Sequence, residues 1–168
     1  MSKIAFVLAD DFEDSEFGTP KAALIEAGHE VDVIGTETGV VTGKNGTEVS
    51  ITTVVTDADP ADYAALVIPG GFSPDHLRTD DDIVEFVKRM AARDVPVAAV
   101  CHAPSLLIEA ELVNGRTMTS WPSIRTDLRN AGADVVDREV VVDGRFISSR
   151  NPDDLPAFSA AIIEQLRS

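Results

Sequence analysis

The stretch Val95-Pro96-Val97-Ala98-Ala99-Val100-Cys101-His102-Ala103-Pro104 decides the fold of this chain. Val95 to Val100 form a continuous apolar run, which is typical of a parallel strand covered on both faces. A helix-like segment extends from Pro104 to Leu112, and proline is tolerated best at the start of a helix. A buried strand that leads directly into a helix is the repeating unit of an α/β fold.

The same alternation of strand and helix continues on both sides of this stretch. Strands are predicted at Lys3–Ala9, Glu30–Ile34, Ala64–Ile68 and Thr117–Thr119, and helices at Glu16–Ala27, Asp80–Arg93, Ser123–Ala131 and Leu155–Leu166. Asn45-Gly46 and Asp143-Gly144 are turn signals that predict two hairpins, the second of which pairs Val135–Val142 with Arg145–Ser148. The pattern predicts one domain, residues 1–168, with a flavodoxin-like, doubly wound and mostly parallel α/β sheet to which β-hairpins are attached.

The composition excludes several kinds of partner. With 14 basic and 29 acidic residues the chain carries a formal net charge of −15, which disfavours binding to nucleic acid or to anionic membranes. Its apolar runs are too short to span a bilayer, and the first residues lead into a strand without the pattern of a signal peptide. We therefore expect a cytoplasmic protein.

The chain contains one cysteine, Cys101, and three histidines. This inventory excludes an intrachain disulfide and a structural zinc site, and no spacing of acidic residues and histidines is diagnostic of another metal. The sequence predicts no metal and no cofactor. A lone cysteine is most often a small buried side chain, so its surroundings must indicate whether it is reactive.

Three loops of chemical interest follow predicted parallel strands. Asp10–Asp14 follows the first strand, Gly70–His76 follows Ala64–Ile68, and Cys101–Pro104 follows the central apolar run. Ligands of open parallel sheets bind beyond the carboxyl ends of the strands. We therefore expect the acidic, Gly-Gly and Cys-His loops to converge on one crevice.

Cys101 lies at the step from strand to helix, which is the position of a nucleophile elbow. The positive end of the helix dipole favours the thiolate there and is expected to lower the thiol pKa. The backbone N–H groups of Gly71 and His102, with the neighbouring Gly70, are candidates for an oxyanion hole.

Several blocks of the sequence resemble the PfpI/ThiJ family of intracellular cysteine peptidases, deglycases and stress proteins. Ala98–Pro104 resembles the family's nucleophile segment, and the resemblance extends over nearly the whole chain. Further blocks that resemble family segments are Asp11–Glu16, Val67–Gly71, Pro74–Arg78, Thr119–Ile124 and Ser149–Phe158. The resemblance implies a class I glutamine amidotransferase-like version of the α/β fold.

The resemblance also implies roles for individual residues. Cys101 matches the nucleophile, and Glu13 matches a protonated carboxyl group that hydrogen-bonds the sulfur. His102 matches the base of the peptidase members, in which a carboxylate of the neighbouring subunit orients the histidine. Asp75 stands at the position of that carboxylate, one methylene shorter than the usual Glu, and this difference argues against peptidase activity.

The resemblance leaves three functions open. The leading expectation is a stress-protection thiol enzyme that acts on reactive carbonyls or glycated adducts, as a deglycase or glyoxalase does. The alternatives are a peptidase that uses Cys101, His102 and Asp75 across a subunit interface, and a redox sensor or chaperone that works through oxidation of Cys101. A homodimer or a higher assembly is expected. Trp121 either walls the crevice or packs at a subunit contact, and Arg150 either completes the site or belongs to an interface.

Overall fold

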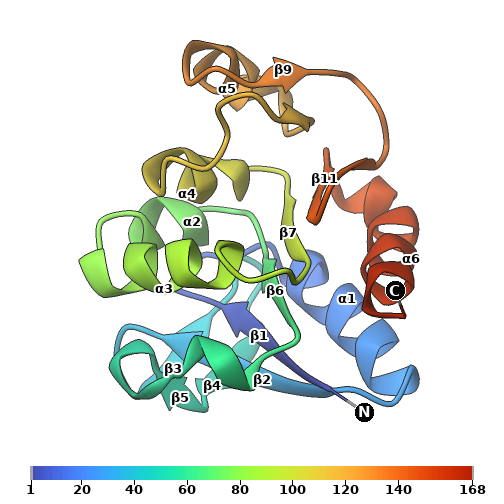
Figure 1. Cartoon of the computed structure of the whole chain (residues 1–168). Coiled ribbons are helices and arrows are strands. Elements are labelled where there is room, and N and C mark those ends of the chain that lie inside the picture. Colours follow the sequence, from blue (N-terminus) through green and yellow to red (C-terminus); the bar gives the residue numbers. More distant parts are fainter. Residues whose placement is uncertain (1, 168) are drawn as a thin grey trace.

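In a computed structural model, residues 2–167 are described and build a seven-stranded sheet in the order β10-β11-β7-β6-β1-β2-β5 (Figure 1). The strands of this sheet are β1 (Lys3–Val7), β2 (Glu30–Gly35), β5 (Thr53–Val54), β6 (Ala65–Ile68), β7 (Val97–Val100), β10 (Val141–Asp143) and β11 (Phe146–Ser149). Neighbouring strands are parallel, except for the antiparallel pair of β10 and β11. The predicted doubly wound, mostly parallel fold is confirmed.

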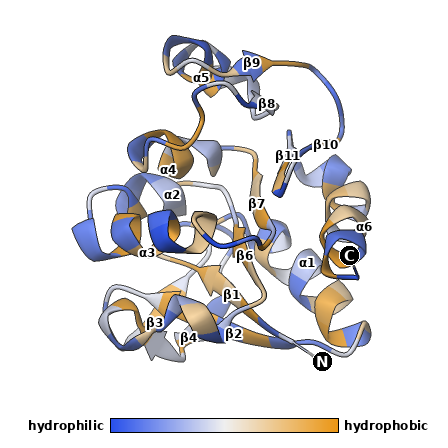
Figure 2. Cartoon of the chain, viewed as in Figure 1, coloured by the Kyte–Doolittle hydropathy of each residue, from blue (hydrophilic) through white to orange (hydrophobic). Residues whose placement is uncertain are grey.

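Helices cover both faces of the sheet. The α-helices are α1 (Asp14–Glu26), α2 (Ser73–Leu77), α3 (Asp81–Ala91), α4 (Pro104–Glu109), α5 (Arg125–Asn130) and α6 (Leu155–Leu166), and the short 3-10 helices are η1 (Val55–Asp57), η2 (Pro60–Asp62), η3 (Pro122–Ile124) and η4 (Pro152–Asp154). Figure 1 shows α1 and α6 on one face of the sheet and α2, α3 and α4 on the other. Hydrophobic segments gather along the strands and the inward helix faces, while the outer faces are hydrophilic (Figure 2).

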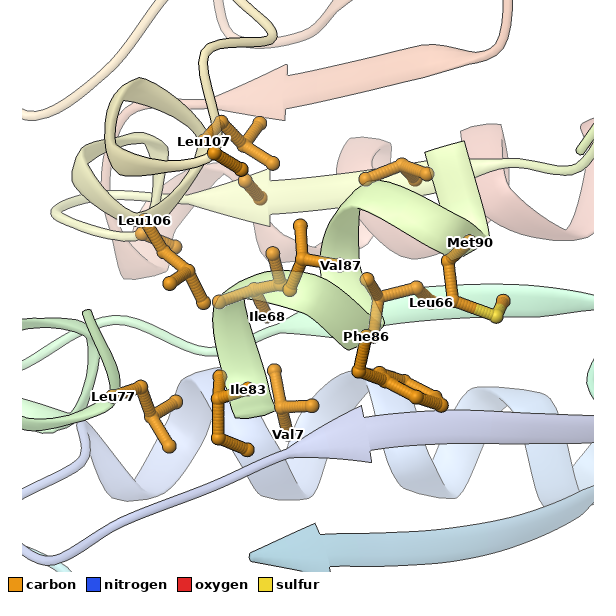
Figure 3. Packing of buried hydrophobic residues seen from close by; sticks show 14 of the residues in the cluster. Val7, Leu66, Ile68, Leu77, Ile83, Phe86, Val87, Met90, Leu106 and Leu107 are labelled. Atoms are coloured by element: carbon orange, nitrogen blue, oxygen red, sulfur yellow. The ribbon is translucent and has the colours of Figure 1, made fainter. Parts of the chain in front are cut away.

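Side-chain alternation along the central strands builds a separate core on each face. In β1, Ile4 and Phe6 belong to the cluster under α1 and α6, whereas Ala5 and Val7 belong to the cluster under α3. Figure 3 shows the second cluster, in which one stripe of α3 packs on β6 and β1. That stripe consists of Ile83, Phe86, Val87 and Met90, all of them buried. Burial of each such side chain contributes roughly 1.5–3 kcal/mol, so the two cores hold the sheet rigid beneath the loops.

Two small strand pairs lie outside the main sheet. The predicted hairpin around Asn45-Gly46 is confirmed as β3 (Gly39–Thr42) and β4 (Glu48–Ile51), which pair antiparallel. The prediction of one strand over Val135–Val142 is wrong. Val135 ends β9 (Asp134–Val135), which pairs in parallel with β8 (Thr117–Met118), and β10 begins only at Val141. The charged residues between Val135 and Val141 interrupt the predicted strand, so two short strands, β9 and β10, form in place of one.

The topology places the carboxyl ends of β1, β6 and β7 side by side. The chain runs from β1 to β2 on one side and later reaches β6 on the other, so a crevice opens where the direction of winding reverses. No helix within residues 2–167 is long and apolar enough to cross a bilayer.

Candidate functional site

The three loops predicted to converge are joined to one another by backbone hydrogen bonds. The Phe72 N–H donates to the Asp11 carbonyl at 2.8 Å, and the Glu13 N–H donates to the Gly70 carbonyl at 3.2 Å. Phe12 and Gly71 form an isolated antiparallel bridge between the same two loops. The third loop begins at Cys101, which lines one cavity together with residues of the other two. The predicted convergence is confirmed.

Cys101 has the backbone conformation of a nucleophile elbow. Its φ angle is +63°, a left-handed value that is unfavourable for a residue with a side chain. The Cys101 N–H donates to the Ser149 carbonyl at 3.0 Å, and its carbonyl accepts the Trp121 N–H at 3.0 Å, so neighbouring segments hold the strained turn. The side chain is 7% exposed and borders the cavity. The fold therefore holds Cys101 in an unfavourable backbone conformation, with its sulfur at the border of the cavity.

Gly71 makes the close approach of the loops possible. Its φ is +75°, and a Cβ atom there would lie 2.5 Å from the Asp11 carbonyl oxygen. We expect Gly71→Ala to lower the free energy of unfolding by about 2–4 kcal/mol, from backbone strain and overpacking together. Gly115→Ala is the matched control, since Gly115 has φ +79° with nothing within 4 Å of a Cβ. Equal losses for both variants in urea unfolding would contradict the clash at Gly71.

The cavity beside Cys101 has a volume of about 430 Å³, enough for a small molecule. It is lined by Glu13, Glu16, Lys44, Gly71, Phe72, Cys101, His102, Trp121 and Pro152. Phe72 and Trp121 are 66% and 38% exposed, respectively, and provide aromatic walls at its edge. Trp121 therefore walls the crevice, one of the two positions expected for it.

Glu16, in the first turn of α1, is the carboxyl group that interacts with the sulfur. Its side chain is fully buried, and Oε1 accepts the Gly70 N–H at 2.9 Å. The carboxyl group is also close enough to the Cys101 thiol for each group to influence the pKa of the other. Burial is the main cause that raises the Glu16 pKa to about 8, and the charge of Glu13 acts in the same direction. Glu16 is therefore largely protonated at neutral pH, and the prediction that Glu13 occupies this place is wrong.

Glu13 instead forms an ion pair with Lys44, which also lines the cavity. Its Oε2 lies 3.3 Å from the Lys44 Nζ, and the Lys44 side chain is half exposed. Lys44 belongs to the β3–β4 turn, which Asp14 holds by accepting the Asn45 and Thr47 N–H groups at 2.9 Å each. The turn is thereby fixed over the start of α1, and Lys44 is kept at the lining of the cavity.

His102 is held on three sides. Its Nδ1 lies 3.3 Å from the Cys101 Sγ, and its Nε2 lies 3.2 Å from the Ser123 Oγ. The ring stacks on Trp121 with centroids 6.0 Å apart. Burial and then the charge of Lys44 lower the His102 pKa, so the ring is neutral at pH 7 and can accept a proton.

The thiol of Cys101 is subject to opposing influences. Burial, followed by the charge of ionised Glu16, raises its pKa to about 12, whereas the N–H groups of His102 and Gly71 lower it. The lowering expected from the helix start is therefore outweighed. Because Glu16 is itself largely protonated below its pKa of about 8, its contribution to this rise disappears at neutral pH. Departure of the thiol proton then requires an acceptor, and His102 is adjacent to it.

Three other residues that the sequence singled out lie elsewhere or are already engaged. The Gly70 N–H is bonded to Glu16 and is not free for a substrate. Asp75 is exposed on α2 and does not line the cavity. Arg150 binds Asp154 through Nε and Nη2 and Asp137 through Nη1, so it ties loops together outside the cavity. Within residues 2–167 no group of three or more His, Cys, Asp or Glu side chains could hold a metal ion.

Sequence reasoning missed Glu16, Lys44 and Ser123. A signal for Glu16 existed, because Glu16, Pro20 and Leu24 recur every four residues and are all buried on one face of α1. Lys44 and Ser123 reach the site through loops whose position depends on the tertiary fold, and no local pattern indicates them.

The chain is similar to known proteins over nearly its whole length. The profile of the DJ-1/PfpI family matches residues 2–165. General stress protein 18 of Bacillus subtilis (strain 168) is 52% identical over 169 residues, covering 97% of this chain and 98% of that protein. An uncharacterized protein of Staphylococcus aureus (strain N315) is 48% identical over 168 residues, covering 98% of each chain.

Solved structures show the same fold. A two-domain protein from Anabaena variabilis, with DJ-1/ThiJ/PfpI-like and ferritin-like domains, superposes with a TM-score of 0.98 at 39% identity. The match covers 99% of this chain and 48% of that one, so this chain spans about half of the two-domain protein. Drosophila melanogaster DJ-1beta superposes with a TM-score of 0.91 at 28% identity, over 99% of this chain and 91% of that chain. Together with the match over residues 2–165, these similarities show that the chain belongs to the DJ-1/PfpI family.

Proposed function

We propose that this protein is a stress-protection thiol enzyme that acts on small reactive carbonyl compounds. The observation that carries the proposal is the strained Cys101, whose sulfur borders a small cavity with a neutral histidine 3.3 Å away. The similarity to a general stress protein supports a stress-related role. The carbonyl substrate is the step beyond that similarity.

The proposed chemistry begins with transfer of the thiol proton to His102 as the sulfur attacks the aldehyde carbon of methylglyoxal. The carbonyl electron pair moves to oxygen, which takes the proton back and forms a hemithioacetal. A proton is then removed from C1 of the adduct and a proton is added at C2. The C2 carbonyl becomes a hydroxyl and the C1 hydroxyl becomes a carbonyl, which gives a thioester of lactate. Water hydrolyses the thioester and restores the thiol, and the sum is methylglyoxal plus water giving lactate.

The residues of the cavity suit this sequence. Protonated Glu16 presents no negative charge to the developing thiolate, and the N–H groups of Gly71 and His102 approach the sulfur. A cavity of about 430 Å³ admits methylglyoxal or an early glycation adduct on a flexible side chain.

The test is the consumption of methylglyoxal and the formation of lactate, followed by NMR with wild type and Cys101→Ala. We expect lactate from wild type and none above the uncatalysed background from the variant. Since the chain has one cysteine, the comparison removes every thiol at once. Equal rates for the two proteins would defeat the proposal.

A redox role is the second candidate, because the same groups that approach a thiolate also suit a sulfinate. The N–H groups of Gly71 and His102 and the acid of Glu16 would each donate to its oxygens. Mild peroxide is then expected to add two oxygens to Cys101 while circular dichroism stays unchanged. An unmodified intact mass after treatment would count against this role.

A further inference from the structure

We propose that Ser123 positions His102 in the one neutral tautomer that can accept the Cys101 proton. The inference rests on the proposed function insofar as His102 serves there as the proton acceptor. It assigns the orienting role to a hydroxyl of the same chain, in place of the carboxylate of a neighbouring subunit that the Asp75 position suggested.

The geometry leaves each ring nitrogen of His102 with a different partner. Nδ1 faces the Cys101 Sγ at 3.3 Å, and Nε2 faces the Ser123 Oγ at 3.2 Å. Ser123 lies in η3, and the Trp121 N–H that precedes this helix is anchored on the Cys101 carbonyl at 3.0 Å. The segment that carries the hydroxyl is therefore fixed to the nucleophile itself.

The tautomer follows from the number of protons that a neutral imidazole ring carries. A neutral imidazole carries one N–H, so it can accept the thiol proton at Nδ1 only when its own proton is on Nε2. That Nε2–H needs an acceptor, and the Ser123 oxygen has lone pairs at hydrogen-bond distance. When the thiol proton arrives, the imidazolium donates to Ser123 from Nε2 and to the sulfur from Nδ1.

The charges around the ring are compatible with this assignment. Burial and then the charge of Lys44 lower the His102 pKa, so the ring is neutral before the transfer. Glu13 is paired with Lys44, and Glu16 is largely protonated at neutral pH. Within residues 2–167 the Ser123 hydroxyl lies at hydrogen-bond distance from Nε2, and Asp75 of the same chain is exposed on α2, outside the lining of the cavity.

The tautomer is measured directly by long-range 1H–15N correlation on histidine-labelled protein at pH 8, with His102→Asn to assign the ring among three histidines. We expect protonated Nε2 and unprotonated Nδ1 for His102 in wild type, and a mixture of tautomers in Ser123→Ala. Ser123→Thr keeps the hydroxyl and is expected to restore the wild-type pattern. A proton on Nδ1 in wild type would overturn the proposal, because Ser123 would then donate and His102 could not accept.

The rate of Cys101 alkylation by iodoacetamide gives the second readout. Loss of one hydrogen bond is expected to slow alkylation about fivefold in Ser123→Ala at pH 7, with Ser123→Thr close to wild type. Ser50→Ala, an exposed serine on β4, is the matched control. A rate that falls with Asp75→Asn but not with Ser123→Ala would overturn the proposal in favour of a partner's carboxylate. Neither readout uses methylglyoxal, so the failure of the proposed function and the failure of this assignment are distinguishable.

Discussion

Glu16→Gln is expected to remove most of the decrease in the free energy of unfolding that wild type undergoes between pH 5 and pH 8.5. The Glu16 pKa is raised in the folded chain from an ordinary 4.5 to about 8, mainly by burial. The folded state therefore holds this proton more tightly than the unfolded state does. The stability associated with it is fully present below pH 4.5 and is lost as the pH rises through about 8, which amounts to roughly 3–5 kcal/mol.

Glutamine has the shape of the protonated acid and cannot ionise, so the variant loses this pH dependence while keeping an acceptor for the Gly70 N–H. Urea unfolding at several pH values measures both curves. Glu26→Gln is the matched control, because Glu26 lies exposed at the end of the same helix and its replacement removes one charge without changing a buried group. Parallel curves for wild type and Glu16→Gln would show that Glu16 does not hold a proton in the folded state.

The fold was predictable wherever burial imposed a clear pattern. The apolar runs of β1, β6 and β7 are fully buried, and Leu155–Leu166 is a helix with the bounds that the sequence predicted. The error at Val135–Val142 arose because β-branched residues at both ends suggested a single strand. The charged residues between them were the opposing signal, and β9 in fact pairs with β8.

The sequence was sufficient to predict which loops form the site, but not which carboxyl group lies beside Cys101. Strand ends converge in any doubly wound sheet, so Cys101, Gly71 and the acidic loop could be brought together without coordinates. Choosing between Glu13 and Glu16 required the start of α1, since the two differ by three residues, nearly one turn. Glu13 is the N-cap and reaches outward to Lys44, while Glu16 points inward with the core face of the helix.

Lys44 and Ser123 show what the sequence could not predict. Lys44 lies on the β3–β4 turn and lines the cavity, and Ser123 lies in η3 and contacts His102. Each is held in place by a distant segment. For Lys44 that segment is Asp14 at the start of α1, and for Ser123 it is the hydrogen bond from Trp121 to the Cys101 carbonyl. Contacts of this kind depend on tertiary geometry and leave no periodicity along the chain.

The same Glu16→Gln change is expected to speed the alkylation of Cys101 at alkaline pH. Above the Glu16 pKa of about 8, the ionised carboxylate raises the pKa of the neighbouring thiol and suppresses the thiolate. Glutamine carries no charge at any pH, so the thiolate forms more readily in the variant. We expect its alkylation rate at pH 9 to exceed that of wild type by about tenfold or more, which corresponds to one pKa unit of repulsion. At pH 6.5, where Glu16 is protonated, the two rates are expected to be similar.

Iodoacetamide labelling followed by intact mass provides this measurement without ambiguity, because Cys101 is the one thiol of the chain and Cys101→Ser gives the blank. The decisive quantity is the ratio of the variant rate to the wild-type rate as a function of pH. A ratio that rises between pH 7 and pH 9 reports the ionisation of Glu16 next to the sulfur. A ratio that stays constant would mean that the carboxyl group does not ionise beside Cys101 in this range. Glu16 would then have a structural role, as the acceptor of the Gly70 N–H, and would not control the ionisation of the thiol.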